Sequence, residues 1–256
     1  MRKAILVTGA GSGIGRATAA HFAQQGWWVG AFDRDAPALD SLAAELGADA
    51  GLFTPLDVTD RDALIAALDA FGHGSVGRLD ILFNNAGIDA KGPFVDTPWD
   101  RLVKVVDVNL IAGMSLIHAA WPLLKATPGS ICISTASASA IFGVAGMAAY
   151  SASKHGIKGL TEALSVEFAA AGVRAADILP GIIDTGMLTP EHKAALPSAG
   201  MWRPLPASAV AEAVMAAYEG DRLHYYVPTE LAEFDASQTR DPETVRDQRI
   251  AGKMLG

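Results

Sequence analysis

The chain has 256 residues, half of them hydrophobic, and a formal net charge of −8. This size and composition favour one large α/β domain spanning residues 1–256, with ample core, over two small domains. The acidic balance argues against a nucleic-acid partner or an anionic membrane surface. The lone cysteine, Cys132, excludes an internal disulfide and favours a reducing cytosol, so we expect a cytoplasmic protein. The histidines show no ligand-like spacing, which argues against a metal site.

Short apolar segments rich in branched residues alternate along the chain with alanine-rich segments of helical period. The expected strands are Ala4–Thr8, Trp28–Asp33, Gly51–Leu56, Leu79–Asn84, Ser130–Ser134, Val173–Leu179 and His224–Val227. The expected helices are Ile14–Gln25, Pro37–Leu46, Arg61–Phe71, Trp99–Lys125, Ala148–Ala171 and Ser208–Tyr218. Nearly continuous apolar strands alternating with helices predict a doubly wound parallel sheet of about seven strands, with helices on both faces.

The segment Val105–Leu124 is the nearest approach to a membrane span, but Asp107, Asn109 and His118 interrupt it. We therefore expect a largely buried helix and no membrane partner.

Proline recurs near residues 186–206, where the apolar side chains are Met187, Leu188, Leu196, Met201 and Trp202. This composition predicts a mobile lid over a hydrophobic pocket. The alternative is that these side chains pack on the core without touching substrate. A charged tail is expected from about Pro228.

A glycine-rich loop joins the first strand to the first helix, with Gly9, Ser12, Gly13, Ile14 and Gly15 spaced Gly-x-x-x-Gly-x-Gly. Glycines let a backbone approach a pyrophosphate closely, and a helix N-terminus offers free N–H groups to it. The loop therefore predicts a Rossmann-like dinucleotide site. A glycine turn selected only for tight packing is the alternative.

Asp33 ends the second expected strand, eighteen residues after Gly15. A carboxylate there can accept hydrogen bonds from the adenosine ribose hydroxyls and repels a 2′-phosphate. This favours NAD over NADP. Arg34 is the counter-evidence, because it could reach that phosphate.

Tyr150 precedes Lys154 by four residues, so both stand on one helix face, and Ser137 lies thirteen residues before Tyr150. A nearby ammonium favours a phenolate, so Lys154 is expected to lower the pKa of Tyr150 and make it an acid/base. Together with the glycine loop, this pair indicates a redox enzyme.

At this point the chain resembles the short-chain dehydrogenase/reductase family in its compact form. The resemblance covers roughly residues 3–187 and rests on five motifs in order. These are Thr8-Gly-x-x-x-Gly-x-Gly15, Leu56-Asp57-Val58, Asn84-Asn85-Ala86-Gly87, Ser137 with Tyr150-x-x-x-Lys154, and Pro180-Gly181 followed by Thr185.

The resemblance implies roles for the matching residues. Asp57 and Val58 would contact the adenine. Asn84, Ala86 and Gly87 would line the cofactor and stabilise the sheet. Past Pro180, Ile183 and Thr185 would meet the nicotinamide amide and a phosphate.

The resemblance also implies a catalytic set of Ser137, Tyr150, Lys154 and Asn109. Tyr150 would exchange the substrate proton, Ser137 would hold the substrate oxygen, and Lys154 would hold the nicotinamide ribose. Asn109 would hold a proton-relaying water, or would instead be a buried polar bridge between helices. Ser139 is expected to be a pocket residue.

These features predict hydride transfer between NAD(H) and a secondary alcohol or ketone. An NADPH-dependent carbonyl reductase and a non-catalytic NAD(H)-binding sensor or scaffold are the alternatives. Pairing of the helices Trp99–Lys125 and Ala148–Ala171 between subunits would give a homodimer or homotetramer.

Overall fold

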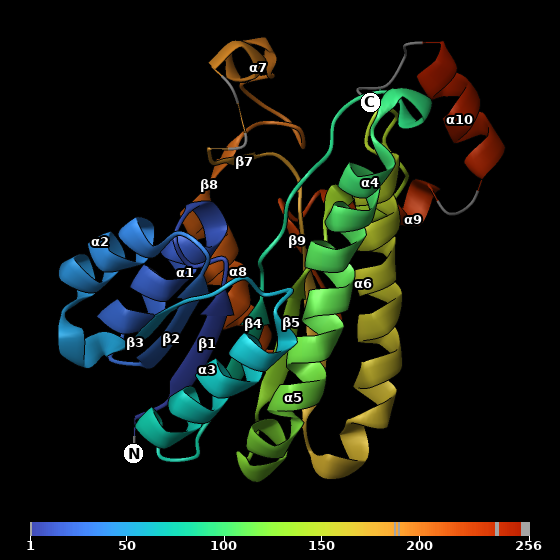
Figure 1. Cartoon of the computed structure of the whole chain (residues 1–256). Helices are drawn as coiled ribbons and strands as arrows, with labels where there is room; N and C mark the ends of the chain where they lie inside the picture. The colour runs from blue at the N-terminus through green and yellow to red at the C-terminus, as the bar shows by residue number, and fades with distance from the viewer. Residues whose placement is uncertain (1, 187, 189, 239–240, 252–256) are drawn as a thin grey trace.

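Seven parallel strands form one sheet in a computed structural model that describes residues 2–186, 188, 190–238 and 241–251 (Figure 1). The strands are β1 Ala4–Thr8, β2 Trp28–Asp33, β3 Gly51–Pro55, β4 Ile81–Asn84, β5 Ile131–Thr135, β6 Arg174–Pro180 and β9 His224–Val227. Their order is β3-β2-β1-β4-β5-β6-β9, which confirms the predicted doubly wound sheet. The order reverses between β1 and β4, and a crevice for a ligand opens beyond the carboxyl ends of strands at such a point.

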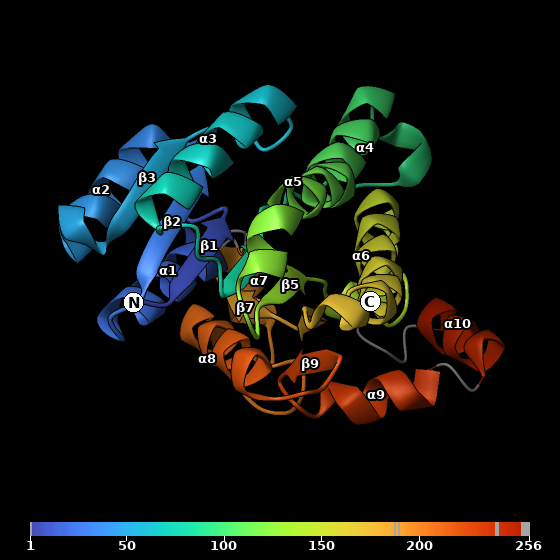
Figure 2. The ribbon, with the colours of Figure 1, turned by 90° about the horizontal axis from the view of Figure 1, so that it is seen from below.

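Helices cover both faces of the sheet (Figures 1 and 2). The helices are α1 Gly13–Gln24, α2 Ala36–Leu46, α3 Arg61–Gly74, α4 Trp99–Val106, α5 Ala112–Ala126, α6 Ala148–Glu167, α7 Pro190–Ala195, α8 Ala207–Glu219, α9 Leu231–Gln238 and α10 Pro242–Ile250. Side chains of α1, α2 and α8 form one core layer with the strands, and those of α3, α5 and α6 form the other. Burial on both faces explains why the strands are apolar at nearly every position.

The expected helix Trp99–Lys125 contains an interruption that its composition did not predict. Between α4 and α5 the residues Asp107–Ile111 (η3) form a π-helical turn, a wide turn often found at functional sites. The run Trp99–Ala126 is long and apolar enough to cross a membrane by length and composition alone. Its side chains Leu116, Ala120 and Leu124 are nevertheless buried in the core.

The expected helix Ala148–Ala171 also ends early. Its regular part, α6, stops at Glu167, and a 3₁₀ turn follows at Ala169–Ala171 (η5). Gly172 then takes a left-handed conformation with φ 71°, which ends the helix.

The segment after Pro228, predicted as a charged tail, also contains helices. It forms α9 and α10 within the described residues, and α9 buries Leu231 and Phe234 against Met201 and Trp202 of the preceding segment. Leu231 and Phe234 are three residues apart and share one helix face. This apolar face holds α9 against the protein, although the charged residues around it hide the pattern in the sequence.

The segment at 186–206 carries its own secondary structure. It includes α7. Its C-terminal end, β8 Leu205–Pro206, pairs in parallel with β7 Ile183–Asp184, which lies just before the segment.

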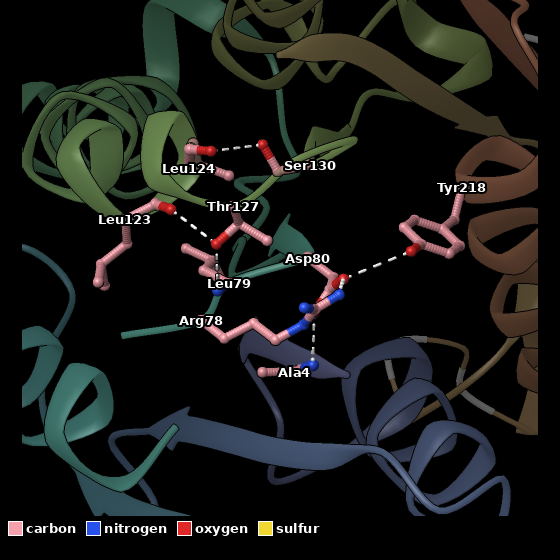
Figure 3. A network of polar contacts seen from close by, with 9 residues as sticks. All are labelled: Ala4, Arg78, Leu79, Asp80, Leu123, Leu124, Thr127, Ser130 and Tyr218. Atoms are coloured by element: carbon pink, nitrogen blue, oxygen red, sulfur yellow. Dashed lines mark hydrogen bonds and ion pairs between the residues drawn. The ribbon is translucent and has the colours of Figure 1, made fainter. Parts of the chain in front are cut away.

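A polar network anchors the sheet at the amino ends of β1 and β4 (Figure 3). The buried Asp80 carboxylate accepts hydrogen bonds from the Ala4 amide at 2.9 Å and from Arg78 Nε at 2.7 Å. Thr127 Oγ1 accepts from the Leu79 amide at 2.9 Å and donates to the Leu123 carbonyl at 2.9 Å. This network ties together the amino ends of β1 and β4, at the end of the sheet opposite the glycine loop.

Candidate active site

A cavity of about 730 Å³ lies at the carboxyl ends of the strands, and most of the predicted site residues line it. Those on its wall are Gly9, Ser12, Gly13, Ile14, Asp33, Asp57, Val58, Ala86, Gly87, Ser137, Tyr150, Lys154, Pro180, Ile183 and Thr185. Among the predicted residues, Gly15, Asn84 and Asn109 lie behind that wall.

The glycine loop opens α1, whose N-cap residue, Ser12, makes no side-chain capping bond. Gly9 and Gly13 have φ values of 68° and 50°, a conformation that residues with a Cβ rarely adopt. A Cβ on Gly15 would overlap the Gly9 carbonyl, so this glycine is required by packing within the loop. Packing within the loop thus explains Gly15, whereas Gly9 and Gly13 line the cavity that a ligand can approach.

Asp33 ends β2 beside this loop. One of its carboxylate oxygens accepts from the Gly11 amide at 2.8 Å and the other from the Asp35 amide at 2.9 Å. These bonds hold the carboxylate at the cavity wall. Arg34 lines the same part of the cavity and is exposed.

Asp57 lies at the neighbouring strand end. The Thr59 hydroxyl at 2.7 Å and the Thr59 amide at 2.9 Å donate to it and lower its pKa, with a further contribution from Lys104. Asp57 therefore remains a carboxylate at this end of the cavity.

The four-residue turn after β4 positions a different asparagine from the one expected. Asn84 is buried, donates to Ser134 Oγ at 3.5 Å and is absent from the cavity wall. Side chains alternate along a strand, so Asn84 faces the helix layer near Gly113 and Asn85 reaches the cavity. Asn85 Nδ2 donates to the Thr8 carbonyl and its Oδ1 accepts from Thr135 Oγ1 at 3.1 Å, which joins the turn to the glycine loop and to β5.

Tyr150 is held between Ser137 and the buried start of α6. Burial raises the pKa of Tyr150, the hydrogen bond with Ser137 lowers it, and the Asp89 carboxylate raises it further. The predicted lowering by Lys154 is thus not what this structure shows, because loss of solvent outweighs the nearby groups. The Lys154 Nζ lies 5.6 Å from the centre of the Tyr150 ring.

Lys154 has only 3 % of its surface exposed, and its Nζ donates to the Thr135 carbonyl at 2.7 Å. Burial lowers its pKa to about 8. The ammonium therefore sits at the junction of β5 and α6, facing the same cavity as Tyr150.

Asn109 lies in the π-helical turn and bridges two segments. Its Oδ1 accepts from the Ile88 amide at 2.8 Å, and its Nδ2 donates to the Ile88 carbonyl at 2.9 Å and to Ser153 Oγ at 3.1 Å. Asn109 thus forms a buried polar bridge to Ile88 and Ser153, and the water-holding role implied by the family resemblance stays a prediction. A Cβ on Gly87 would lie 3.3 Å from Asn109 Oδ1 and 3.6 Å from Lys154 Nζ, so this bridge is next to the lysine.

The rest of the cavity is mainly apolar. Its wall includes Phe142, Val144, Met147, Leu188, Leu196 and Trp202. Of the predicted lid side chains, Met201 packs instead in the cluster that contains Phe234, and Met187 lies outside the described residues. Two charged residues of this wall, Asp89 and Lys91, pair with each other at 3.5 Å.

The residues present fit a dinucleotide with a nicotinamide ring. Gly9 and Gly13 leave bare backbone on the cavity wall, and the N-terminus of α1 is free of side-chain caps, so its N–H groups can bind a phosphate. Asp33 at the end of β2 and Lys154 on α6 both line the cavity.

Fold and site together define an α/β protein whose parallel sheet carries a glycine-rich loop, a serine, a tyrosine and a lysine around one cavity at its carboxyl end. A family model described as short chain dehydrogenase matches residues 3–195, and the chain belongs to this family of oxidoreductases.

Two similar proteins, one named as a dehydrogenase and one as a reductase, illustrate the activities found among the relatives of this chain. The chain is 34 % identical over 192 residues to a cyclohexanol dehydrogenase of an Acinetobacter species, which covers 73 % of this chain and 75 % of the relative. It is 37 % identical over 191 residues to the 3-oxoacyl-[acyl-carrier-protein] reductase of Thermotoga maritima, covering 72 % and 76 %.

Among solved structures, a short chain dehydrogenase/reductase of Burkholderia phymatum in complex with NAD superposes with a TM-score of 0.85. The two chains are 25 % identical, and the match covers 95 % of each.

Proposed function

We propose that the protein is an NAD-dependent dehydrogenase that interconverts a secondary alcohol and its ketone. One observation carries the proposal: Tyr150, hydrogen-bonded to Ser137, shares a cavity with the dinucleotide-type glycine loop. A protein that only bound the nucleotide would not need a buried phenol in that cavity.

Each residue of the set has a role that follows from its contacts. The bound nicotinamide would accept or return the hydride. In oxidation, Ser137 would donate a hydrogen bond to the substrate oxygen, and the deprotonated form of Tyr150 would take the hydroxyl proton as the C–H bond breaks. In reduction, Tyr150 returns this proton to the forming alkoxide.

Lys154 would supply positive charge beside Tyr150 once a ribose and a substrate exclude the remaining water. Asn109 fixes the Ile88 backbone and Ser153 behind Lys154, so it would hold the lysine's surroundings in place.

The choice of NAD over NADP rests on Asp33. Its carboxylate is fixed at the cavity wall by the Gly11 and Asp35 amides, and a negative charge there repels a 2′-phosphate. Arg34 on the same wall supports the alternative of an NADPH-dependent reductase. Initial rates with NADH and NADPH distinguish the two, and a markedly better NADPH rate would reverse the assignment.

The broader test is a panel of secondary alcohols and ketones, assayed in both directions by nicotinamide absorbance. Turnover of several members with NAD(H) is the expected result. Tight NADH binding without turnover of any member would favour a non-catalytic sensor instead.

We also propose a homodimer or homotetramer. Apolar side chains are exposed at three- to eight-residue intervals along α4 and its continuation into α5, at Trp99, Val103, Ile111 and Met114. Several large apolar side chains exposed along one helical segment are typical of an interaction site. Light scattering during size-exclusion chromatography tests this proposal, and a Met114→Glu or Ile111→Glu variant is expected to dissociate. A wild-type mass of one chain would refute it.

A further inference from the structure

The helix α9 lies beside strand β9, and none of its described residues lines the cavity (Figure 2). It nevertheless supports the cavity wall. The Phe234 ring contacts the Trp202 ring edge-on, with 5.4 Å between the ring centres, and Trp202 lines the cavity. Next to Trp202, Arg203 Nη1 donates at 2.9 Å to the carboxylate of Glu230, which immediately precedes α9. The segment that carries Trp202 is therefore held by α9.

The apolar cluster around α9 also adjoins a residue assigned to catalysis. Leu231 and Phe234 are buried in this cluster. Ala136 and Ala138, which flank Ser137, belong to it as well. Because a packed interior transmits displacement, a shift of α9 would alter the packing behind Ser137 and behind the cavity wall.

One carboxylate links α9 to two neighbouring elements. Asp235 Oδ2 accepts from Lys158 Nζ of α6 at 2.7 Å and from the Tyr226 hydroxyl of β9 at 2.6 Å. Only 18 % of the Lys158 side chain and 9 % of the Asp235 side chain are exposed, so salt screens this ion pair little. Burial and the Asp235 carboxylate raise the pKa of Tyr226, whose hydroxyl therefore remains a donor.

Lys158 connects this carboxylate to the helix of the proton-transfer residues. It follows Lys154 by four residues on α6, and Lys154 follows Tyr150 by four. The helix that brings Tyr150 and Lys154 to the cavity is thus bonded, through Lys158, to the helix that supports Trp202.

We propose that Lys158 and Asp235 are positioning residues that set the size of the substrate site. Their ion pair holds α9 against α6, so that α9 keeps Trp202 on the cavity wall and limits the apolar bulk that can reach Tyr150. This inference rests on the proposed function and adds to it the residues that restrict the substrate.

The test uses two ketones that differ by one bulky apolar group, cyclohexanone and 4-tert-butylcyclohexanone, reduced with NADH. Asp235→Asn keeps the shape of the side chain and removes its charge. The ratio of kcat/KM for the bulky ketone to that for the small one should rise roughly three- to tenfold, because Trp202 is held less firmly and makes room. Lys158→Met removes the other partner and should raise the ratio equally.

A double variant shows whether the two residues act through each other. Either single substitution already breaks the ion pair, so Lys158→Met/Asp235→Asn should raise the ratio no further than either alone. Effects that multiply would refute the shared role. Glu233→Gln changes an exposed carboxylate of the same helix, is the matched control, and should leave the ratio unchanged.

Two further measurements separate this role from a general loss of stability. The NADH dissociation constant should change less than about twofold, because β4, β5 and β6 lie between β9 and the strand that carries the glycine loop. Hydrogen exchange should become faster in α9 and in residues 198–203 of either single variant, and should stay unchanged in α1 and α2. A protein that is merely less stable would lose activity on both ketones alike and keep the ratio.

The possible failures are distinguishable. An unchanged ratio in either single variant refutes the positioning role while the proposed function stands. If the wild type reduces neither ketone, the smallest and the bulkiest ketone that it turns over in the wider panel take their place. Absence of turnover over the whole panel refutes the proposed function and, with it, the role of Lys158 and Asp235 in substrate choice.

Discussion

Lys154 offers a quantitative test of the site that needs no substrate. Its amine is buried at the junction of β5 and α6, and its described hydrogen bond is to a neutral carbonyl, that of Thr135. Removing an ammonium from water is costly, which is why its pKa falls from 10.5 to about 8. The unfolded chain therefore holds this proton more strongly than the folded protein does.

The pH dependence follows from this difference. Below about pH 8 the amine is protonated in both states, and the folded state bears the full cost of burying the charge. Between the two pKa values the unfolded chain binds more protons, so stability gains from rising pH. From about pH 7.5 to about pH 9.5 the gain from this one group is about 2 kcal/mol.

Urea unfolding of the cofactor-free protein measures the effect. The free energy of unfolding of the wild type, minus that of Lys154→Met, should rise by about 2 kcal/mol over that range. Lys125→Met is the control, because this exposed ammonium stays in water in both states, and it should run parallel to the wild type. A wild-type minus Lys154→Met difference that stays flat, or falls with pH, would refute the reasoning.

Four further outcomes are expected. Tyr150→Phe should keep its NADH dissociation constant, measured by fluorescence titration, and lose about 10²- to 10⁴-fold in kcat, because only the proton-transferring oxygen is removed; unchanged kcat would contradict the mechanism. Ser137→Ala removes the hydrogen bond that lowers the pKa of Tyr150, so the alkaline rise in the oxidation rate should move to higher pH in a pH–rate profile. Asp33→Asn should raise the ratio of NADPH to NADH rates about tenfold by removing one repulsive charge, and an unchanged ratio would shift attention to Arg34. Phe234→Ala, which removes the ring lying 5.4 Å from the Trp202 ring, should cost about 3 kcal/mol of unfolding free energy and raise KM more than it lowers kcat.

The sheet and its helices could be predicted from the sequence because both are set by local patterns. Each strand is an apolar run bounded by turn residues, and β1 and β2 begin and end where the pattern indicated. The π-helical turn at Asp107–Ile111 and the helix α9 were missed for a shared reason. Both depend on contacts with distant segments, such as Asn109 with Ile88 and Phe234 with Trp202.

The candidate site shows the same division. Motif spacing located Ser137, Tyr150 and Lys154, which the structure brings to one cavity. Spacing did not distinguish Asn84 from Asn85, although strand alternation into the turn could have done so. The direction of the Tyr150 pKa shift also escaped, because the extent of burial is a property of the whole fold.

The pairing of β1 with β4 has a consequence for cooperativity. In the proposed binding mode the adenosine would lie over β1–β3 and the reaction would take place over β4–β6, and these halves of the sheet are joined where Ile5–Val7 pair with Ile81–Phe83. A dinucleotide reaching from Asp33 to Lys154 would cross the β1–β4 pairing and contact both halves of the sheet. Cofactor saturation would then do more than raise the melting temperature by mass action, because it would also make the two halves open together.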